Sequence, residues 1–355
     1  MPDWEFWIDV GGTFTDCIAR TPSGELRPIK VLSSGVTKGQ AAEVQGTNRV
    51  VDPLRRADPD EFWLGYEFRF LDESGQTLLT SRVAAFHRRL GVMEVATLLP
   101  PSISSGTRYE LSANEEAPIL AIRTALELRR DQPIPPVTVR LGTTRGTNAL
   151  LTRRGARTVF VTTRGFADVL LIANQDRPRL FDLDIQKPEP LFADVLEIDE
   201  RLDADGRVLK APDETKIRQQ LESLVKDRPS LAICLLHSFA NSAHEQLVER
   251  IAREVGFTEI SVSSRLAPLI KIVSRGDTTV MDAYLNPILR EYVGRLREQL
   301  QASGGRQPPG DVVARQVSGT ALAAGVCIYA IPAASAVPLT CRATTSPGGL
   351  RPPLA

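Results

Sequence analysis

The sequence has few residues that could build a metal cage or a disulfide framework. Its 355 residues include only three histidines and four cysteines, and neither a CxxC nor an HExxH spacing occurs. The cysteines, Cys17, Cys234, Cys327 and Cys341, are scattered without a paired spacing. A site built on His and Cys is therefore not expected, and a cytoplasmic, reducing location is the prediction.

Net charge is also lacking. The 43 basic residues balance the 43 acidic ones, so no net field draws the chain to nucleic acid or to an anionic membrane. This balance favours a small-molecule partner. Neither a GxxxxGK[ST] loop nor a GxGxxG turn is present, so phosphate binding would require another kind of loop.

The opening stretch "WIDVGGTFTD", residues 7–16, offers such a loop. An apolar strand ends at an aspartate, and glycines without a Cβ let backbone N–H groups approach an oxyanion. Threonine hydroxyls add hydrogen bonds, and the carboxylates can bind Mg²⁺ through its water shell. The alternative is a hairpin with ordinary turn glycines and capping aspartates. The candidate phosphate-site residues are Asp9, Gly11, Gly12, Thr13, Thr15 and Asp16, with Asp9 and Asp16 as magnesium ligands.

Hydrophobic periodicity divides the chain into stretches of different character. Residues 4–33 predict β-hairpins, and residues 45–117 contain a further hairpin-like segment around "DESGQ". From 118 to 300, helical and strand patterns alternate, which favours an α/β layered fold with a mixed sheet. The pattern predicts a helix over "GFADVLLIAN" and a long one from Asp277 that bends at Pro287.

Several blocks resemble one family of ATP-using enzymes. Residues 7–16 resemble the first phosphate loop of the actin, hexokinase and Hsp70 class, and most closely that of the hydantoinase A and 5-oxoprolinase family. Residues 140–192 resemble the second block of that family, and "IDERLDADGRV", "SLAICLLHSFANSAHEQLVERI" and "IVSRGDTTVMDAYLNPIL" follow in the expected order. The implied fold is an α/β lobe of the actin/hexokinase-like (ribonuclease H-like) kind, incomplete, with a mixed sheet and an inserted β-rich subdomain over 45–117.

The resemblance implies ATP-dependent hydrolysis of a cyclic amide, foremost 5-oxo-L-proline to L-glutamate in glutathione turnover. Phosphate transfer to the carbonyl oxygen creates a leaving group, and water then opens the ring. Such chemistry requires ATP and Mg²⁺ but no protein nucleophile, so no catalytic residue is assigned. The implied partners are the small cyclic amide and a hydantoinase B-like component, fused or separate, in a larger oligomer.

The resemblance also marks a second candidate site for an anion or substrate. Between residues 142 and 148 a strand end leads into a helix N-terminus, which offers oriented N–H donors; the alternative is a capped helix. Two further positions come from the matching block "IVSRGDTTVMDAYLNPIL", where the alternatives are a surface ion pair for Arg275 and a helix-face charge for Asp282. The residues are Gly142, Thr143, Thr144, Thr147, Asn148, Arg275 and Asp282.

Other functions remain open from the sequence. A hydantoin-opening enzyme or an ATP-using ketone carboxylase subunit would share these blocks, and a sugar or polyol kinase would share the fold. A remnant lobe that binds a partner subunit is the non-enzymatic alternative, with an exposed apolar face as its signature.

The resemblance stops near residue 300, and residues 301–355 have a different composition. From residue 305 onward there is one acidic residue, Asp311, and neither lysine nor glutamate. The interpretations are an out-of-frame or truncated end, which we favour, a disordered terminus, or a membrane segment over 316–341. We expect a chain without a second phosphate loop to be inactive alone.

Overall fold

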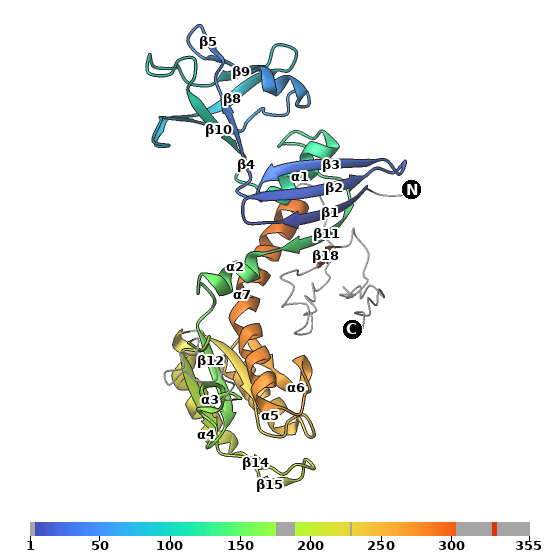
Figure 1. The fold of residues 1–355 in the computed structure, drawn as a ribbon, viewed down its shortest axis with the longest axis vertical. Coiled ribbons are helices and arrows are strands. Elements are labelled where there is room, and N and C mark those ends of the chain that lie inside the picture. The colour runs from blue at the N-terminus through green and yellow to red at the C-terminus, as the bar shows by residue number, and fades with distance from the viewer. Residues whose placement is uncertain (1–3, 175–188, 228, 303–328, 332–355) are drawn as a thin grey trace, which may run out of the picture. The chain divides into compact units, whose positions relative to one another are not determined.

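The computed structural model describes residues 4–174, 189–227, 229–302 and 329–331. The chain divides into two compact units (Figure 1). The first contains the described residues up to Arg145, the end of the last helix from Val293, and residues 329–331; the second runs from Gly146 to Tyr292. The expectations for the tail fall on 303–328 and 332–355, which lie outside the described residues.

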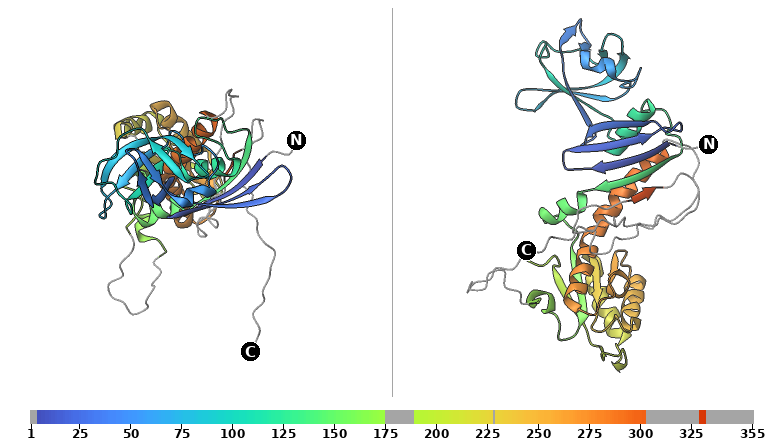
Figure 2. Two further views of the ribbon diagram at one scale, coloured as in Figure 1. Left: turned by 90° about the horizontal axis from the view of Figure 1, so that it is seen from above. Right: turned by 45° about the vertical axis from the view of Figure 1, so that its right-hand side comes forward.

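The first unit is built on a five-stranded sheet in the order β18-β11-β1-β2-β3. β1, β2 and β3 form an antiparallel meander, and β11 runs parallel to β1. Exposed and buried residues alternate along β2, so one face of the sheet is buried, and helix α1 packs against these three strands (Figure 2). The bounds are β1 Trp4–Val10, β2 Phe14–Arg20, β3 Leu26–Leu32, α1 Ala117–Leu126, β11 Val137–Thr143 and β18 Tyr329–Ile331.

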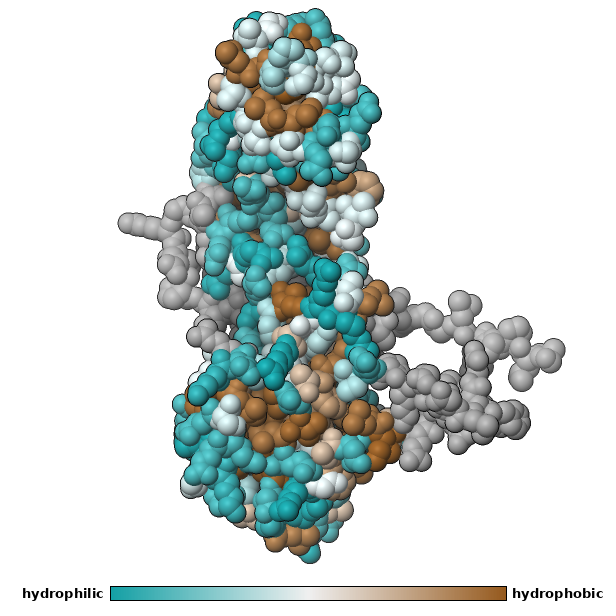
Figure 3. Space-filling model, turned by 90° about the vertical axis from the view of Figure 1, so that its left-hand side faces the viewer, coloured by the Kyte–Doolittle hydropathy of each residue, from teal (hydrophilic) through white to brown (hydrophobic). Residues whose placement is uncertain are grey.

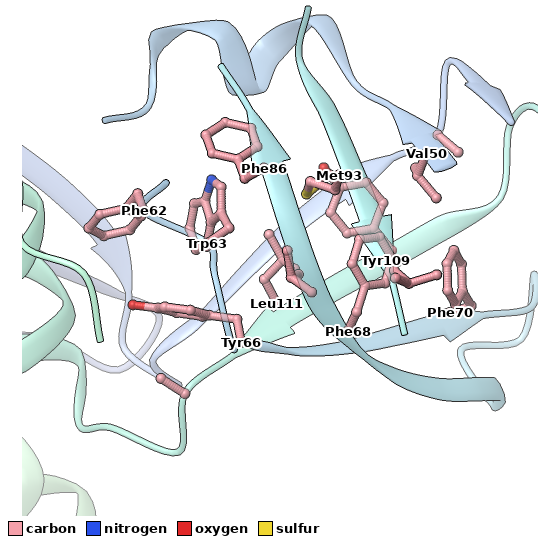
Figure 4. Close-up of a cluster of buried hydrophobic side chains, with 14 of the residues drawn as sticks. Val50, Phe62, Trp63, Tyr66, Phe68, Phe70, Phe86, Met93, Tyr109 and Leu111 are labelled. Carbon is pink, nitrogen blue, oxygen red and sulfur yellow. The ribbon is translucent and has the colours of Figure 1, made fainter. Parts of the chain in front are cut away.

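An inserted β-rich segment lies between β3 and α1. The sequence predicted it over 45–117, whereas its first strand begins earlier, at Val36. Its seven strands follow the order β4-β10-β7-β8-β9-β6-β5, and the predicted hairpin is β7–β8, closed by Asp72 and Gln76. Aromatic side chains dominate its core (Figure 4). The bounds are β4 Val36–Gln40, β5 Glu43–Gln45, β6 Arg49–Val51, η1 Pro53–Ala57, β7 Glu67–Leu71, β8 Thr77–His87, β9 Val92–Val95 and β10 Arg108–Ser112.

The second unit is a parallel sheet in the order β13-β12-β16-β17 with helices on both faces. Val161 and Ile233 point to the face that α4 and α5 cover, whereas Phe160 and Ala232 point to α7. Burial on both faces explains the unbroken apolar run of β16. The bounds are β12 Thr158–Thr163, β13 Asp194–Ile198, α4 Glu214–Leu224, β16 Ser230–Cys234, α5 Ala243–Val255, β17 Ile260–Val262 and α7 Ile272–Ala302.

Two helix predictions differ from the structure in their bounds. The helix expected over 165–174 is reduced to α3 (Val169–Ile172). The residues before it form a turn, in which the Phe166 N–H donates to the Thr163 carbonyl at 3.1 Å and Gly165 has a φ of +89°. The long helix begins five residues before Asp277 and contains Pro287. The remaining elements are α2 Arg145–Leu151, β14 Arg201–Leu202, β15 Val208–Lys210, η2 Val225–Asp227 and α6 Ser263–Leu266.

Within the described ranges, no helix combines the length and the apolar character needed to cross a lipid bilayer.

The aromatic core of the inserted segment predicts a stability effect. Phe68 is fully buried, and its ring centroid lies 4.5 Å from that of Phe70 and 4.6 Å from that of Tyr109. We expect Phe68→Ala to lower the free energy of unfolding by about 3–5 kcal/mol. Leu78→Ala, at a 43% exposed position of β8, is the control and should cost less than about 1 kcal/mol. Urea unfolding followed by tryptophan fluorescence measures both, and equal losses would contradict this packing.

Candidate functional site

The turn between β1 and β2 exposes backbone N–H groups at the end of the first strand. Gly11 donates its N–H to the Phe14 carbonyl at 3.0 Å, and a Cβ on Gly11 would lie 2.9 Å from that same oxygen. A side chain at this position would therefore force the turn to shift. Gly12 and Thr13 are exposed, and their N–H groups have no protein partner in the part of the chain that the structure describes.

The two predicted magnesium ligands are neighbours on one exposed face of the sheet. Asp9 pairs directly across from Asp16 in the antiparallel register, and both side chains are exposed. Lys30 of β3 binds the Asp16 carboxylate at 2.8 Å, whereas Asp9 has no ion-pair partner among the described residues. The two carboxylates therefore differ, because Asp16 already has a cation and Asp9 is available for one.

The end of β11 lies beside this turn. Asp9 is in register with Gly142, and Val10 with Thr143, across the parallel pair β1–β11. The backbone N–H of Thr144 donates to the Val10 carbonyl at 3.1 Å. The structure therefore places the first three residues of the second candidate segment next to the first loop. This edge, where parallel strands end, is where α/β sheets commonly bind ligands.

Two predicted site threonines turn their hydroxyls inward. Thr15 is fully buried, and its hydroxyl shares a 2.9 Å hydrogen bond with the hydroxyl of Ser33. Thr143 is also buried, and its hydroxyl accepts the Arg145 N–H at 3.2 Å, which is the capping contact of the alternative interpretation. The groups that face solvent at this edge therefore include Asp9, Gly12 and Thr13.

Thr147 and Asn148 lie in α2 and belong to the second unit. Asn148 is exposed, and its carbonyl accepts both the N–H and the hydroxyl of Thr152. The first loop belongs to the first unit, so the structure does not bring these two side chains together with it in one unit.

Arg275 holds the backbone inside the second unit. It is fully buried in α7, donating to the carbonyl of Leu235 at 2.6 Å and to that of Leu269 at 3.3 Å. Its guanidinium also lies 5.7 Å from the ring centroid of Phe239. The alternative of a surface ion pair is therefore wrong, because the guanidinium fixes the loop after β16 to the segment before α7.

Asp282 is likewise buried, with 4% of its surface exposed, so the alternative of a charge on an exposed helix face is wrong. Its Oδ2 accepts hydrogen bonds from the Ser261 hydroxyl at 2.5 Å and from Asn286 Nδ2 at 3.0 Å. Burial raises the pKa of Asp282 to about 7, although the Ser261 hydrogen bond opposes the shift. Arg275 and Asp282 therefore both make contacts within their own unit.

A buried polar network at the ends of β12 and β16 was not among the predicted site residues. His244 Nδ1 lies 2.6 Å from Glu200 Oε2, and the Thr163 hydroxyl donates to the other oxygen of Glu200. The same hydroxyl accepts the Leu236 N–H at 2.8 Å. The three residues lie in three of the blocks that carry the family resemblance, but these blocks are far apart in the sequence, so only the fold shows that their side chains meet.

In the described part of the chain, no group of three or more His, Cys, Asp or Glu side chains is arranged to hold a metal ion. Asp9 fits a cation that keeps most of its waters and shares phosphate oxygens, which is how Mg²⁺ commonly binds with nucleotides.

Comparison with known proteins gives both family and fold. The family described as "Hydantoinase/oxoprolinase N-terminal region" matches residues 5–62 and 102–256. The 5-oxoprolinase of Saccharomyces cerevisiae is 37% identical to the chain, with the match covering 51% of this chain and 17% of that protein. The chain therefore matches about a sixth of that relative's length.

Two solved structures share the fold. The ATP-dependent caprolactamase from Pseudomonas jessenii matches 86% of this chain and 34% of its own, with a TM-score of 0.50 and 21% identity. A nucleotide-free acetone carboxylase matches 86% of this chain and 35% of its own, with a TM-score of 0.51 and 16% identity. The predicted α/β fold with a mixed sheet is confirmed, and these matches are consistent with the actin/hexokinase-like kind.

The buried carboxyl of Asp282 predicts a pH-dependent stability difference. Its pKa is about 7 in the folded chain and about 3.9 when unfolded, so the folded state holds the proton more tightly. The resulting stabilisation is present at low pH and is lost as the pH rises from about 4 through about 7. We expect the free energy of unfolding of Asp282→Asn, relative to wild type, to increase across this range.

Chemical unfolding at about pH 5 and about pH 8 measures this difference. Asp205→Asn, at an exposed turn position, is the matched control and should show no such change. A constant difference between Asp282→Asn and wild type at both pH values would contradict a buried, protonated Asp282.

Proposed function

Because the chain belongs to the hydantoinase/oxoprolinase family, of which it contains the N-terminal region, we propose that it binds the phosphates of ATP for the hydrolysis of a cyclic amide. One observation carries the proposal. The β1–β2 turn lies next to the end of the parallel strand β11, and beside it is Asp9, which has no ion-pair partner within the described ranges.

The turn has the groups that a polyphosphate requires. The unpartnered N–H groups of Gly12 and Thr13 are donors for phosphate oxygens, and glycine leaves room for their approach. The Asp9 carboxylate would hold the water shell of Mg²⁺, which neutralises phosphate charge when it is bound. Asp16 is a weaker candidate ligand because Lys30 already pairs with it. Phosphoryl transfer depends mostly on such positioning and charge neutralisation.

The substrate we propose is a small cyclic amide, foremost 5-oxo-L-proline. The amide carbonyl oxygen takes the γ-phosphoryl group of ATP and ADP leaves; water then adds to the activated carbon, the C–N bond breaks, and phosphate and the ring-opened acid are released. The names of the matched relatives, a 5-oxoprolinase and an ATP-dependent caprolactamase, support this class of substrate. Glutathione turnover, a cytoplasmic location and a hydantoinase B-like partner in an oligomer belong to the same proposal.

Two other functions have specific support. The fold shared with acetone carboxylase favours ATP-dependent carboxylation of a ketone, which a substrate trial separates from ring opening. Apolar side chains at the surface favour a lobe that binds another protein surface. Figure 3 shows such side chains on the second unit, where the exposed ones include Leu171, Ile172, Leu269 and Ile270.

The proposal predicts that Asp9 carries the magnesium-dependent part of ATP binding. We expect Asp9→Asn to weaken Mg·ATP binding at least about tenfold, which equals about 1.4 kcal/mol, because the amide lacks the negative charge that holds the cation. Isothermal titration calorimetry measures the dissociation constant with Mg²⁺ and with EDTA, and the difference between these conditions should disappear in Asp9→Asn.

Glu25→Gln is the matched control, because Glu25 is an exposed acid at the opposite end of the β2–β3 hairpin, paired with Arg27. It should bind Mg·ATP as wild type does. A folded wild-type chain that does not bind Mg·ATP, or an Asp9→Asn variant that binds it equally well, would contradict the proposed function.

A further inference from the structure

We propose that Ser33 is a positioning residue of the phosphate loop, a role that rests on the proposed function. Ser33 follows β3 and contacts the loop twice. Its N–H donates to the Thr13 carbonyl at 2.9 Å, and its hydroxyl shares a 2.9 Å hydrogen bond with the Thr15 hydroxyl. One residue thus fixes both the backbone of the turn and the first buried side chain of β2.

The Thr15 hydroxyl depends on Ser33 for its hydrogen bond. Thr15 is fully buried, and Ser33 is the only side chain that bonds its hydroxyl in the part of the chain described. A buried hydroxyl without a partner is costly, so loss of the Ser33 hydroxyl would favour a shift of Thr15. Thr13, in the turn, is two residues before Thr15 in the chain. A shift of Thr15 would therefore also reorient the backbone N–H groups of the turn that we propose bind the phosphates.

Ser33 is itself held in place from the far side of its turn. Gly35 donates its N–H to the Leu32 carbonyl at 2.9 Å and has a φ of +69°, and an added Cβ would lie 2.3 Å from the Glu115 carbonyl oxygen. Residue 115 lies two positions before the start of α1, and its carboxylate accepts a hydrogen bond from the buried Arg123 at 2.9 Å. The turn that carries Ser33 therefore packs tightly against a fixed part of the first unit.

Because its turn is held in place, Ser33 can position the loop that binds the phosphates. Small displacements of groups that position a substrate have large effects on binding and rate. The Ser33 hydroxyl bonds the hydroxyl of the buried Thr15. It therefore acts on phosphate through the turn and not by direct contact.

The test compares Ser33→Ala, Ser33→Thr and Ser34→Ala in the full chain. Ser34 is an exposed neighbour in the same turn and is the matched control. Calorimetric titration with Mg·ATP gives the affinity, and thermal unfolding of the ligand-free chain gives the stability. We expect Ser33→Ala to weaken binding by about 3- to 10-fold, the value of one hydrogen bond, and Ser33→Thr and Ser34→Ala to bind within about 2-fold of wild type.

The outcomes separate this inference from the proposed function. Wild-type affinity in Ser33→Ala would overturn the positioning role and leave the proposed function standing. Weakened binding that Ser33→Thr does not restore, accompanied by a lower unfolding midpoint, would assign Ser33 a purely structural role and also overturn the inference. If wild type itself does not bind Mg·ATP, both proposals fail.

Discussion

The parallel pairing of β1 with β11 is the constraint on which the proposed site depends. It places Val10 beside Thr143, and the Thr144 N–H binds the Val10 carbonyl. Two segments more than a hundred residues apart thus end at the same edge of one sheet. Since the Gly11–Thr13 turn extends from that edge, its free N–H groups and the Asp9 carboxylate share one exposed region. The inserted β-rich segment and α1 lie in the chain between these two strands, which pair from Trp4 with Val137 to Val10 with Thr143.

Within the exposed region, an ion pair makes the two aspartates, Asp9 and Asp16, different from each other. Asp9 and Asp16 are cross-strand neighbours, yet Lys30 pairs only with Asp16. An anion near the turn therefore meets one carboxylate with a lysine bound to it and one that can hold a cation. This asymmetry agrees with a site that combines phosphate and Mg²⁺, since a second unpaired carboxylate would repel the phosphate oxygens.

The sequence predicted the hairpins, the inserted segment and the alternating α/β stretch well, because each depends on local periodicity and turn residues. It did not predict which way Thr15 points. That direction depends on the length of the turn, and a difference of one residue exchanges the two faces of a strand. Nor did it predict that Arg275 and Asp282 are buried, because their partners, the Leu235 carbonyl and the Ser261 hydroxyl, come from the loop after β16 and from β17. Helical spacing alone does not show which polar residues find such partners.

Hydrogen–deuterium exchange of the whole chain, with and without Mg·ATP, tests the central claim most directly, since it reports the backbone N–H groups themselves. The account predicts that the nucleotide slows exchange in peptides covering residues 10–16 and 142–145, and leaves β7, β8 and the rest of the inserted segment unchanged. Saturable binding of Mg·ATP with protection elsewhere, and none at residues 10–16, would contradict it.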